Sequence, residues 1–259
     1  MKQATTLAAL SLALTAVLSS SVSAADIAPP NADKILQAMS AKIAAAKQFS
    51  YQAHREIDPA LLEGRNLAEK ANVVVNVSRP NRLAARSVSK ERTARFVADG
   101  RNLTLFDETK NVYAQVPMRA SLDGLVAQLD EKFGFTPPLA EFAMSDPYKE
   151  IRQEANKVTY AGLETIGAGF LGLGGVECHR LALKGKVADA ELWVAVGDGL
   201  PRKLVATFKQ TGHPQVRIDF SSWNLTAPVP ASEFTFTPPA GAEKVEMWTK
   251  ARMQAASKH

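Results

Sequence analysis

Apolar and polar residues alternate with a period of two along much of the chain, a pattern typical of β-strands with one buried face. The pattern is clearest in residues 93–116, where short apolar runs are separated by two polar turns. Asp99-Gly100 marks the first turn, because Gly has no Cβ and adopts a positive φ without a steric clash. The segment predicts a three-stranded antiparallel meander, which needs an apolar cover on at least one face.

The same alternation predicts strands on both sides of this meander. Three strands precede it, at residues 49–57, 72–78 and 83–88. A second series follows a helical interruption, and its links are short and rich in Gly, Pro and Asp. Its predicted strands are 158–166, 176–183, 191–196, 202–210, 215–223 and 233–237. We expect about eleven antiparallel strands, a number that favours a curled sheet over a flat one.

Helical spacing of apolar residues appears first near the start of this region. Ile35, Met39 and Ile43 predict one amphipathic helix that follows Asn31 as N-cap and extends to Lys47.

A pair of helices is predicted between the two series of strands. The first follows Ser121 as N-cap and extends to Phe133, and the second is expected at 137–145 and to end at Pro147. Because it is inserted between two sets of antiparallel strands, we expect the pair at 120–146 to lie across the sheet as a lid.

The apolar side chains of this lid are candidates for lining a ligand cavity. If the sheet curls around the helices, these side chains face its concave side. Aromatic residues of the late strands are most simply core residues, and Trp193 is included in case the concave side is incompletely filled. The candidate ligand-binding residues are Leu122, Leu125, Val126, Leu129, Phe133, Leu139, Phe142 and Trp193.

The first residues of the chain have the features of an export signal. Lys2 is followed by an apolar core at 7–18, and Val22-Ser23-Ala24 matches the small-x-small pattern of a cleavage site. The core is too short to span a bilayer comfortably, and no later segment resembles a membrane span. We expect cleavage near Ala24 and a soluble exported protein, which in a Gram-negative cell is periplasmic.

Composition is that of a globular domain with an ordinary core. Of 259 residues, 46% are hydrophobic and 22% charged, and we predict one domain at 25–243 and a tail or frayed helix at 244–259. The formal charge of +5 comes from scattered Lys and Arg with no basic stripe, so nucleic-acid binding is not expected. Cys178 is the single cysteine, which excludes an intramolecular disulfide. We expect no cofactor and no metal.

Two motifs with catalytic or cofactor associations have simpler explanations. Residues 167–172 match G-x-G-x-x-G, but a dinucleotide site needs a strand before the motif and a helix after it. Here another strand pattern follows, which favours an inter-strand loop. Residues 87–90 match S-x-x-K, but Ser87 ends a strand pattern instead of beginning a helix, so we interpret this match as chance.

Cysteine and histidine provide the other chemical candidates. Cys178 and His179 are adjacent on a predicted strand, so they point to opposite faces and do not form a thiolate–imidazolium pair. His54, His179 and His213 lie on separate elements. An enzyme or a metal site would therefore need them to converge in one cleft with an acid.

Segments spread along the chain carry a family resemblance. They are VSRPNRL at 77–83, RFVADGRNLTLFDETKNVYAQVP at 95–117, LDEKFGFTPPLAEFAMSDPY at 129–148, GGVECHRLAL at 174–183, LPRKLVATFKQ at 200–210, SSWNL at 221–225 and FTFTPPAGA at 234–242. Together they resemble domain-of-unknown-function family 2092, a family of predicted periplasmic proteins, from about Phe49 to Ala242.

The resemblance implies a fold as well as a compartment. The family is grouped with the outer-membrane lipoprotein carrier and receptor proteins and with a related sigma-factor regulator. This relation implies an α+β fold, a curved antiparallel half-barrel with helices in its concave mouth and an apolar cavity between them. The family supplies no catalytic residues and no known ligand.

Two hypotheses of different class follow. The first is a non-catalytic periplasmic binding protein for a hydrophobic ligand, either a lipid, an acyl chain or a lipoprotein. Its motivation is an exported β scaffold with an apolar lid and no catalytic constellation. The alternative is an envelope protein-interaction or stress-sensing module, in which the cavity is filled or regulatory. An enzyme ranks third.

Overall fold

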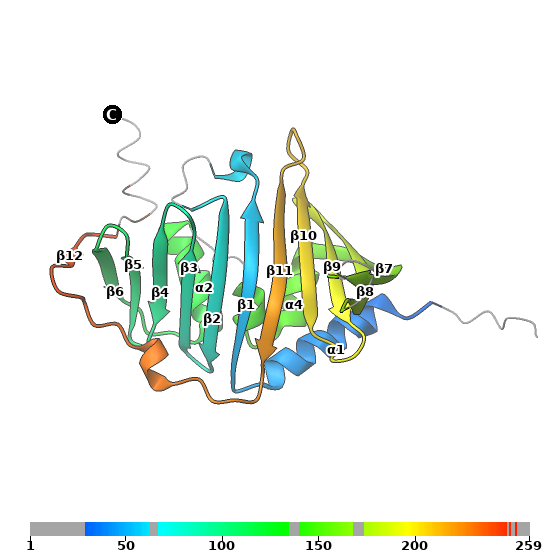
Figure 1. Ribbon diagram of the computed structural model, residues 1–259, viewed down its shortest axis with the longest axis horizontal. Coiled ribbons are helices and arrows are strands. Elements are labelled where there is room, and N and C mark those ends of the chain that lie inside the picture. Colours follow the sequence, from blue (N-terminus) through cyan, green and yellow to red (C-terminus); the bar gives the residue numbers. More distant parts are fainter. Residues whose placement is uncertain are drawn as a thin grey trace, which may run out of the picture.

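The computed structural model describes residues 29–62, 67–134, 140–167, 174–247, 249 and 252. Within this part of the chain, the strands are β1 (Gln48–Ile57), β2 (Lys70–Ser78), β3 (Arg82–Val88), β4 (Thr93–Ala98), β5 (Asn102–Asp107), β6 (Val112–Pro117), β7 (Ala155–Ile166), β8 (Val176–Gly185), β9 (Ala188–Ala195), β10 (Pro201–Phe208), β11 (Gln215–Asn224) and β12 (Glu243–Lys244). They form one open sheet in the order β12-β6-β5-β4-β3-β2-β1-β11-β10-β9-β8-β7 (Figure 1).

The sheet consists of two meanders joined side by side. Strands β1 to β6 pair in sequence order, and so do β7 to β11. Antiparallel pairing of β1 with β11 joins the two series, with Tyr51 opposite Trp223. The antiparallel sheet with about eleven strands is thus confirmed, and β12 adds a two-residue strand that pairs in parallel with β6.

Four α-helices of the described chain cover one face of the sheet, which we call the inner face. They are α1 (Ala32–Ala45), α2 (Leu122–Phe133), α3 (Ala140–Ala143) and α4 (Pro147–Glu154). In Figure 1 helices α2 and α4 lie behind the sheet, and α1 runs along the β7–β11 half. Helix α1 contacts α4 and β7, while α3 contacts the other three helices.

Alternation along the strands creates the inner face. In β1, Phe49, Tyr51 and Ala53 are buried while the residues between them are more exposed. The apolar faces of the strands and helices meet in one core, because neither can leave its apolar side in water. Side chains buried in this core from the helices include Leu36, Met39, Ile43, Leu122, Leu125, Leu129 and Phe142.

The chain after β11 crosses the opposite, outer face of the sheet. This segment, residues 225–242, contains the 3₁₀-helix η3 (Ala231–Phe234) and reaches the far edge, where β12 pairs with β6 (Figure 1). We call it the outer strap. Phe234 packs with Val229 and Ala84, and the Arg82 guanidinium lies 5.0 Å from the centre of the Phe234 ring.

A second aromatic contact fixes the outer strap near that edge. The ring of Phe236 lies 5.3 Å from Phe106 and 5.2 Å from Tyr113, measured between ring centres. The outer face of β3 to β6 is therefore partly covered by chain that belongs to the end of the sequence.

Two local predictions were wrong. Asp146 and Pro147 do not only end a helix: the Asp146 side chain accepts from Lys149 N at 3.0 Å, and Pro147 opens α4. Pro has no N–H to lose at a first helical position, so it begins this helix. Residues 233–237 form no strand, because Phe234 is used as an anchor of η3 on the outer face.

The ends of the chain remain mostly predictions. The apolar segment at 7–18 and the last residues, 253–259, lie outside the described residues. Among the residues that the structure describes, no helix is long and apolar enough to cross a membrane.

The outer strap provides a test of this architecture. Phe234→Ala removes a side chain that is only 2% exposed, so we expect the free energy of unfolding to fall by about 3–5 kcal/mol. Urea unfolding followed by circular dichroism measures the change. Val187→Ala is the control, because Val187 is 63% exposed and its loss should change the free energy by less than about 0.5 kcal/mol. Equal effects of the two substitutions would contradict a packed strap.

Candidate functional site

An aromatic cluster occupies the inner face where the two meanders join. The rings of Tyr51 and Trp223, on paired positions of β1 and β11, have centres 4.8 Å apart. Phe220 lies 5.3 Å from Trp223 and 5.6 Å from Tyr51. Such separations suit offset and edge-to-face ring contacts. The members of the aromatic cluster are Phe49, Tyr51, Phe142, Phe220 and Trp223.

A bulge makes this cluster possible. Residues of a regular strand alternate, so Phe220 and Trp223, three positions apart, would point to opposite faces. The register between β1 and β11 shifts between Gln52 and Ala53, which pair with Ser222 and Phe220. The extra residue lets both aromatic side chains reach the inner face, where both contact the core.

Phe142 closes the cluster from the helical layer. It is 3% exposed, and its ring lies edge-on to Phe220 and Trp223 at 5.9 and 5.8 Å. It belongs to α3, a helix of four residues. The centre of the cluster is therefore covered by one side chain from a short helix.

Arg79, in the turn between β2 and β3, holds this short helix in place. Its guanidinium donates to the carbonyl oxygens of Ala143 at 2.5 Å, Met144 at 2.8 Å and Phe142 at 3.3 Å. It also donates to Ala46 O, just after α1, at 3.2 Å. One planar cation thus satisfies carbonyl groups at the ends of two helices, a role that Lys could not fill.

A second contact ties α2 to the end of α3. The Asp123 carboxylate accepts from the Ser145 backbone N–H at 2.7 Å and from its hydroxyl at 2.5 Å. At the start of α2, Leu122 N donates to Pro80 O at 2.8 Å. Polar contacts therefore join the helical layer to the turn between β2 and β3, and α2 to the chain just after α3.

Two ionisable groups belong to this region. Burial, reinforced by the charge of Glu141, raises the pKa of the Tyr51 phenol, so Tyr51 stays neutral. Glu141, at the start of α3, has a raised pKa because of burial, with further contributions from Glu154 and Glu150. A hydrogen bond within Glu141 opposes this shift. The carboxyl group of Glu141, at the edge of the aromatic cluster, is therefore costly to ionise.

The predicted lid residues meet in the same core. Leu122, Leu125 and Leu129 are buried on α2, and Phe133 is half-buried against them. Val126 is also half-buried, but it is not among the residues of this core. Leu139 lies outside the described residues. These positions remain a predicted ligand site, because only their packing is visible.

Trp193 does not join them, and its expected place on the concave side was wrong. It lies on the outer face with Cys178, Ala195 and Val205, because neighbouring Leu192 and Val194 occupy the inner face. Its indole Nε1 donates to Glu164 at 3.0 Å. The Arg180 guanidinium and the Lys203 ammonium lie 5.4 and 4.7 Å from its ring.

Other expectations about motifs can be compared with the structure. Residues 168–172 of the Gly-rich motif lie outside the described residues, but the strands on either side, β7 and β8, pair antiparallel. A strand–loop–strand connection is not the strand–loop–helix of a dinucleotide site. Ser87 lies within β3, as its alternation predicts.

Cysteine and histidine occupy different surroundings. Cys178 is buried on the outer face, and this burial raises the pKa of its thiol to about 11. His179 points inward, with Nδ1 3.3 Å from the Tyr160 hydroxyl. His54 contacts the Asn72 side chain at 3.0 Å on the outer face, and His213 lies in the turn after β10. The structure therefore brings no two of these histidines together.

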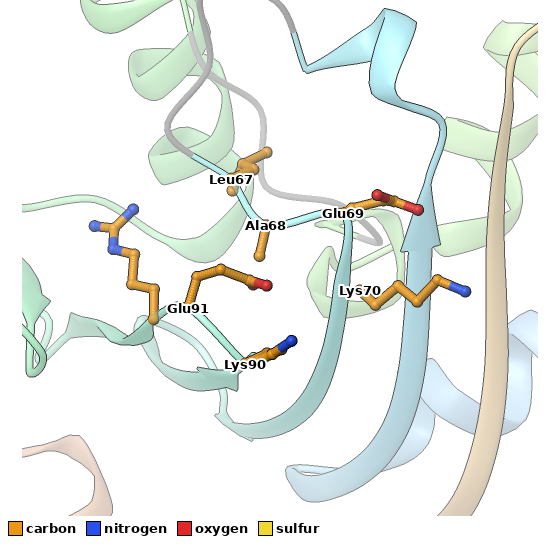
Figure 2. Close-up of a pocket in the computed structure, with 7 residues that line it drawn as sticks. Leu67, Ala68, Glu69, Lys70, Lys90 and Glu91 are labelled. Atoms are coloured by element: carbon orange, nitrogen blue, oxygen red, sulfur yellow. The ribbon is translucent and has the colours of Figure 1, made fainter.

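Two surface cavities of the described part of the chain can be compared with the aromatic cluster. The larger, about 500 Å³, lies at the ends of β2 and β3 and is lined mainly by charged residues (Figure 2). The smaller, about 310 Å³, lies on the outer face beside η3. Neither is lined by the aromatic cluster, which is filled by its own side chains.

Comparison with models of protein families identifies the family to which the chain is related. Residues 32–248 match the model of DUF2092, described as a predicted periplasmic protein. The chain belongs to this family. Membership confirms the resemblance carried by the sequence segments. A comparison with curated proteins finds no match.

Solved structures with related folds are distant from this DUF2092 protein. An uncharacterized conserved protein from Thermus thermophilus has 10% identity and a TM-score of 0.47, over 83% of this chain and 98% of that one. MucB in complex with MucA, from Pseudomonas aeruginosa, has 15% identity and a TM-score of 0.44, over 80% and 61%. A LolA superfamily protein from Nitrosomonas europaea has 13% identity and a TM-score of 0.35, over 80% and 99%.

Arg79 provides the first test of the site. Arg79→Lys keeps the charge but loses the forked contact with several carbonyl groups, so we expect unfolding to become easier by about 2–3 kcal/mol. Hydrogen exchange should increase most in residues 140–146. Arg101→Lys, on an exposed turn, is the control and should change neither quantity. If Arg79→Lys left exchange in 140–146 unchanged, the proposed anchoring would be wrong.

Glu141 provides a test by pH. Because its folded pKa is raised, the wild type holds full stability below the unfolded pKa and loses some as pH rises through the folded value. Glu141→Gln removes this loss, so its advantage in free energy of unfolding should be near zero at pH 3.5 and grow toward pH 7. Urea unfolding across this range measures the difference. Exposed Glu131→Gln should show no such trend, and a flat difference for Glu141→Gln would contradict the assignment.

Proposed function

We propose that this DUF2092 protein is a periplasmic, non-catalytic binding protein for a hydrophobic ligand, either a lipid, a free acyl chain or the acyl chain of a lipoprotein. Its family, described as predicted periplasmic, supports the compartment. In this proposal the N-terminal segment is removed near Ala24 during export. The ligand enters the region between the helical layer and the aromatic cluster.

The observation that carries the proposal is the way Phe142 closes the aromatic cluster. A single ring on a four-residue helix packs edge-on against both Phe220 and Trp223 and covers them from the helical side. Burying a Phe side chain contributes about 1.5–3 kcal/mol, and each buried CH₂ of an acyl chain contributes about 0.8 kcal/mol. About two to four methylene groups therefore replace the contribution of the ring. Exchange of Phe142 for an acyl chain is close to balanced.

The lining of the site suits such a ligand. Around the aromatic cluster, the helical layer presents Leu122, Leu125 and Leu129, all of them buried and apolar. Apolar burial is sufficient to hold an acyl chain and needs no catalytic group. Glu141 at the edge of the cluster, with its raised pKa, is compatible with a neutral polar group on the ligand.

The second candidate is a protein-interaction module of the cell envelope. It is favoured by strand β7, which ends the described sheet and carries Leu163, 57% exposed. An edge strand offers unpaired backbone groups to a partner strand, and an exposed apolar side chain adds contact area. In this function the aromatic cluster is only a core.

Ligand binding can be followed through Trp223. The chain has three Trp residues, so Trp193→Phe with Trp248→Phe leaves Trp223 as the single reporter in the aromatic cluster. A long-chain fatty acid should change its emission. Native mass spectrometry of protein purified from the periplasm should show bound lipid. A protein that carries no lipid and shows no change in emission would contradict the proposal and favour the protein-interaction module.

Substitution of Phe142 separates binding from stability. Phe142→Ala should lower the free energy of unfolding by about 3–5 kcal/mol and strengthen fatty-acid binding several-fold, because no ring has to be displaced. Phe234→Ala is the matched control: it removes an equally buried ring from the outer face and should leave binding unchanged. Phe142→Leu, a smaller change, keeps the test valid if the Ala variant folds poorly. Equal binding by all variants would contradict displacement of Phe142.

A further inference from the structure

A second site lies on the outer face, away from the aromatic cluster. This cavity, of about 310 Å³, is formed where the outer strap crosses β2, β3 and β4. Its lining combines small apolar side chains with three charged ones. The residues are Val74, Asn76, Ala84, Ala85, Arg86, Arg95 and Glu233.

Strand register brings the two arginines together. Arg86 of β3 and Arg95 of β4 are directly opposite, and Val74 of β2 is opposite Arg86 on the other side. Like charges in directly opposite positions destabilise a strand pair unless something offsets them. Glu108 offsets one of them, since its carboxylate accepts from Arg86 at 3.0 and 2.7 Å. Arg86 is thus held by a bidentate ion pair that fixes its position.

Arg95 has no such partner among the described residues. It is half-buried beside the cavity, in the direct neighbourhood of Arg86. Placing a guanidinium there without an anion is unfavourable, because part of its hydration is lost and nothing replaces it. The cavity therefore presents one cation that is available to an incoming anion.

Glu233 supplies the opposite charge on the other side. It is held on η3 by the packing of the adjacent Phe234 against Ala84, and its Oε2 accepts from the Asn76 amide at 3.3 Å. No ion pair joins Glu233 to Arg95, although both line the same cavity. Asn76, which holds Glu233, belongs to β2, and Arg95 belongs to β4. Strand β3 lies between these two strands, and neighbouring strands of a sheet are about 4.8 Å apart.

From this arrangement we infer that the outer-face cavity binds a small zwitterion, whose anionic group contacts Arg95 and whose cationic group contacts Glu233. Val74 and Ala84 form an apolar floor for the short link between the two charges. A purely anionic ligand would be repelled by Glu233, and a purely cationic one by Arg95 and Arg86. Aminoalkyl phosphates and amino acids have the required chemistry, either free or as part of a lipid headgroup.

Binding of O-phosphoethanolamine to the purified protein tests the inference. Titration by calorimetry, with ¹H–¹³C NMR of the Val and Ala methyl groups, should show saturable binding and shifts of Val74 and Ala84. Inorganic phosphate and ethanolamine, each tested alone, should bind at least tenfold more weakly. Equal binding of inorganic phosphate would overturn the zwitterion in favour of a simple anion site. Failure of O-phosphoethanolamine to bind at millimolar concentration would overturn the site itself.

Substitutions of Arg95 and Glu233 test whether each of these two charged side chains contacts the ligand. Arg95→Gln and Glu233→Gln should each weaken binding of O-phosphoethanolamine at least tenfold, while the control Arg101→Gln should bind as the wild type does. Circular dichroism verifies that each variant is folded. If Glu233→Gln instead bound more tightly, the cationic half of the inference would be wrong.

A further experiment distinguishes a free ligand from a lipid headgroup. Binding of the protein to vesicles of phosphatidylethanolamine is compared with its binding to vesicles of phosphatidylglycerol. Binding of O-phosphoethanolamine together with the first vesicles assigns a headgroup source, and binding of O-phosphoethanolamine without vesicle binding assigns a free zwitterion. Fatty-acid binding by the Trp223 reporter is measured in the same variants. It should be unchanged, so that failure at the outer-face cavity is distinguishable from failure at the aromatic cluster.

Discussion

Pairing of β1 with β11 is the contact on which the rest of the structure depends. It joins strands that are further apart in the chain than any other two neighbouring strands of the sheet, and among the described residues it is the one strand pairing between the two meanders. Hydrogen bonds alone would contribute little to such a remote pairing, since water competes for them. The aromatic cluster on its inner face supplies the apolar burial that makes the pairing favourable, and Phe142 links it to the helices.

The two faces of the sheet are covered in different ways. On the inner face, helices cover a broad apolar surface, and polar contacts from Arg79 and Asp123 hold the short α3 in position. On the outer face, the strap covers only part of β3 to β6 and leaves charged side chains beside a cavity. An apolar ligand is therefore proposed for the first face and a small zwitterion for the second.

Much of the fold could be predicted from local patterns. Alternation identified the strands, and helical spacing with the Ser121 N-cap identified α2, since these signals depend only on which side of an element is buried. Errors occurred where a residue had two possible uses. Pro147 either ends a helix or begins one, and Phe234 fits a strand as well as an anchor on the outer face. The residues next to Pro147 and Phe234 in the sequence are compatible with both structural roles, so local sequence patterns do not decide between them.

The sequence by itself determined the family, the predicted export signal, the antiparallel strands and the apolar face of α2. Only the tertiary structure decided which aromatic residues meet. A bulge in β11 brings Phe220 and Trp223 to one face against the rule of alternation, while unbroken alternation in β9 puts Trp193 on the other. Likewise, Arg95 and Glu233 face one cavity because strand register and the outer strap bring distant segments together. Strand register and the path of the outer strap cannot be predicted from one segment alone, since they depend on the apolar burial summed over many strands.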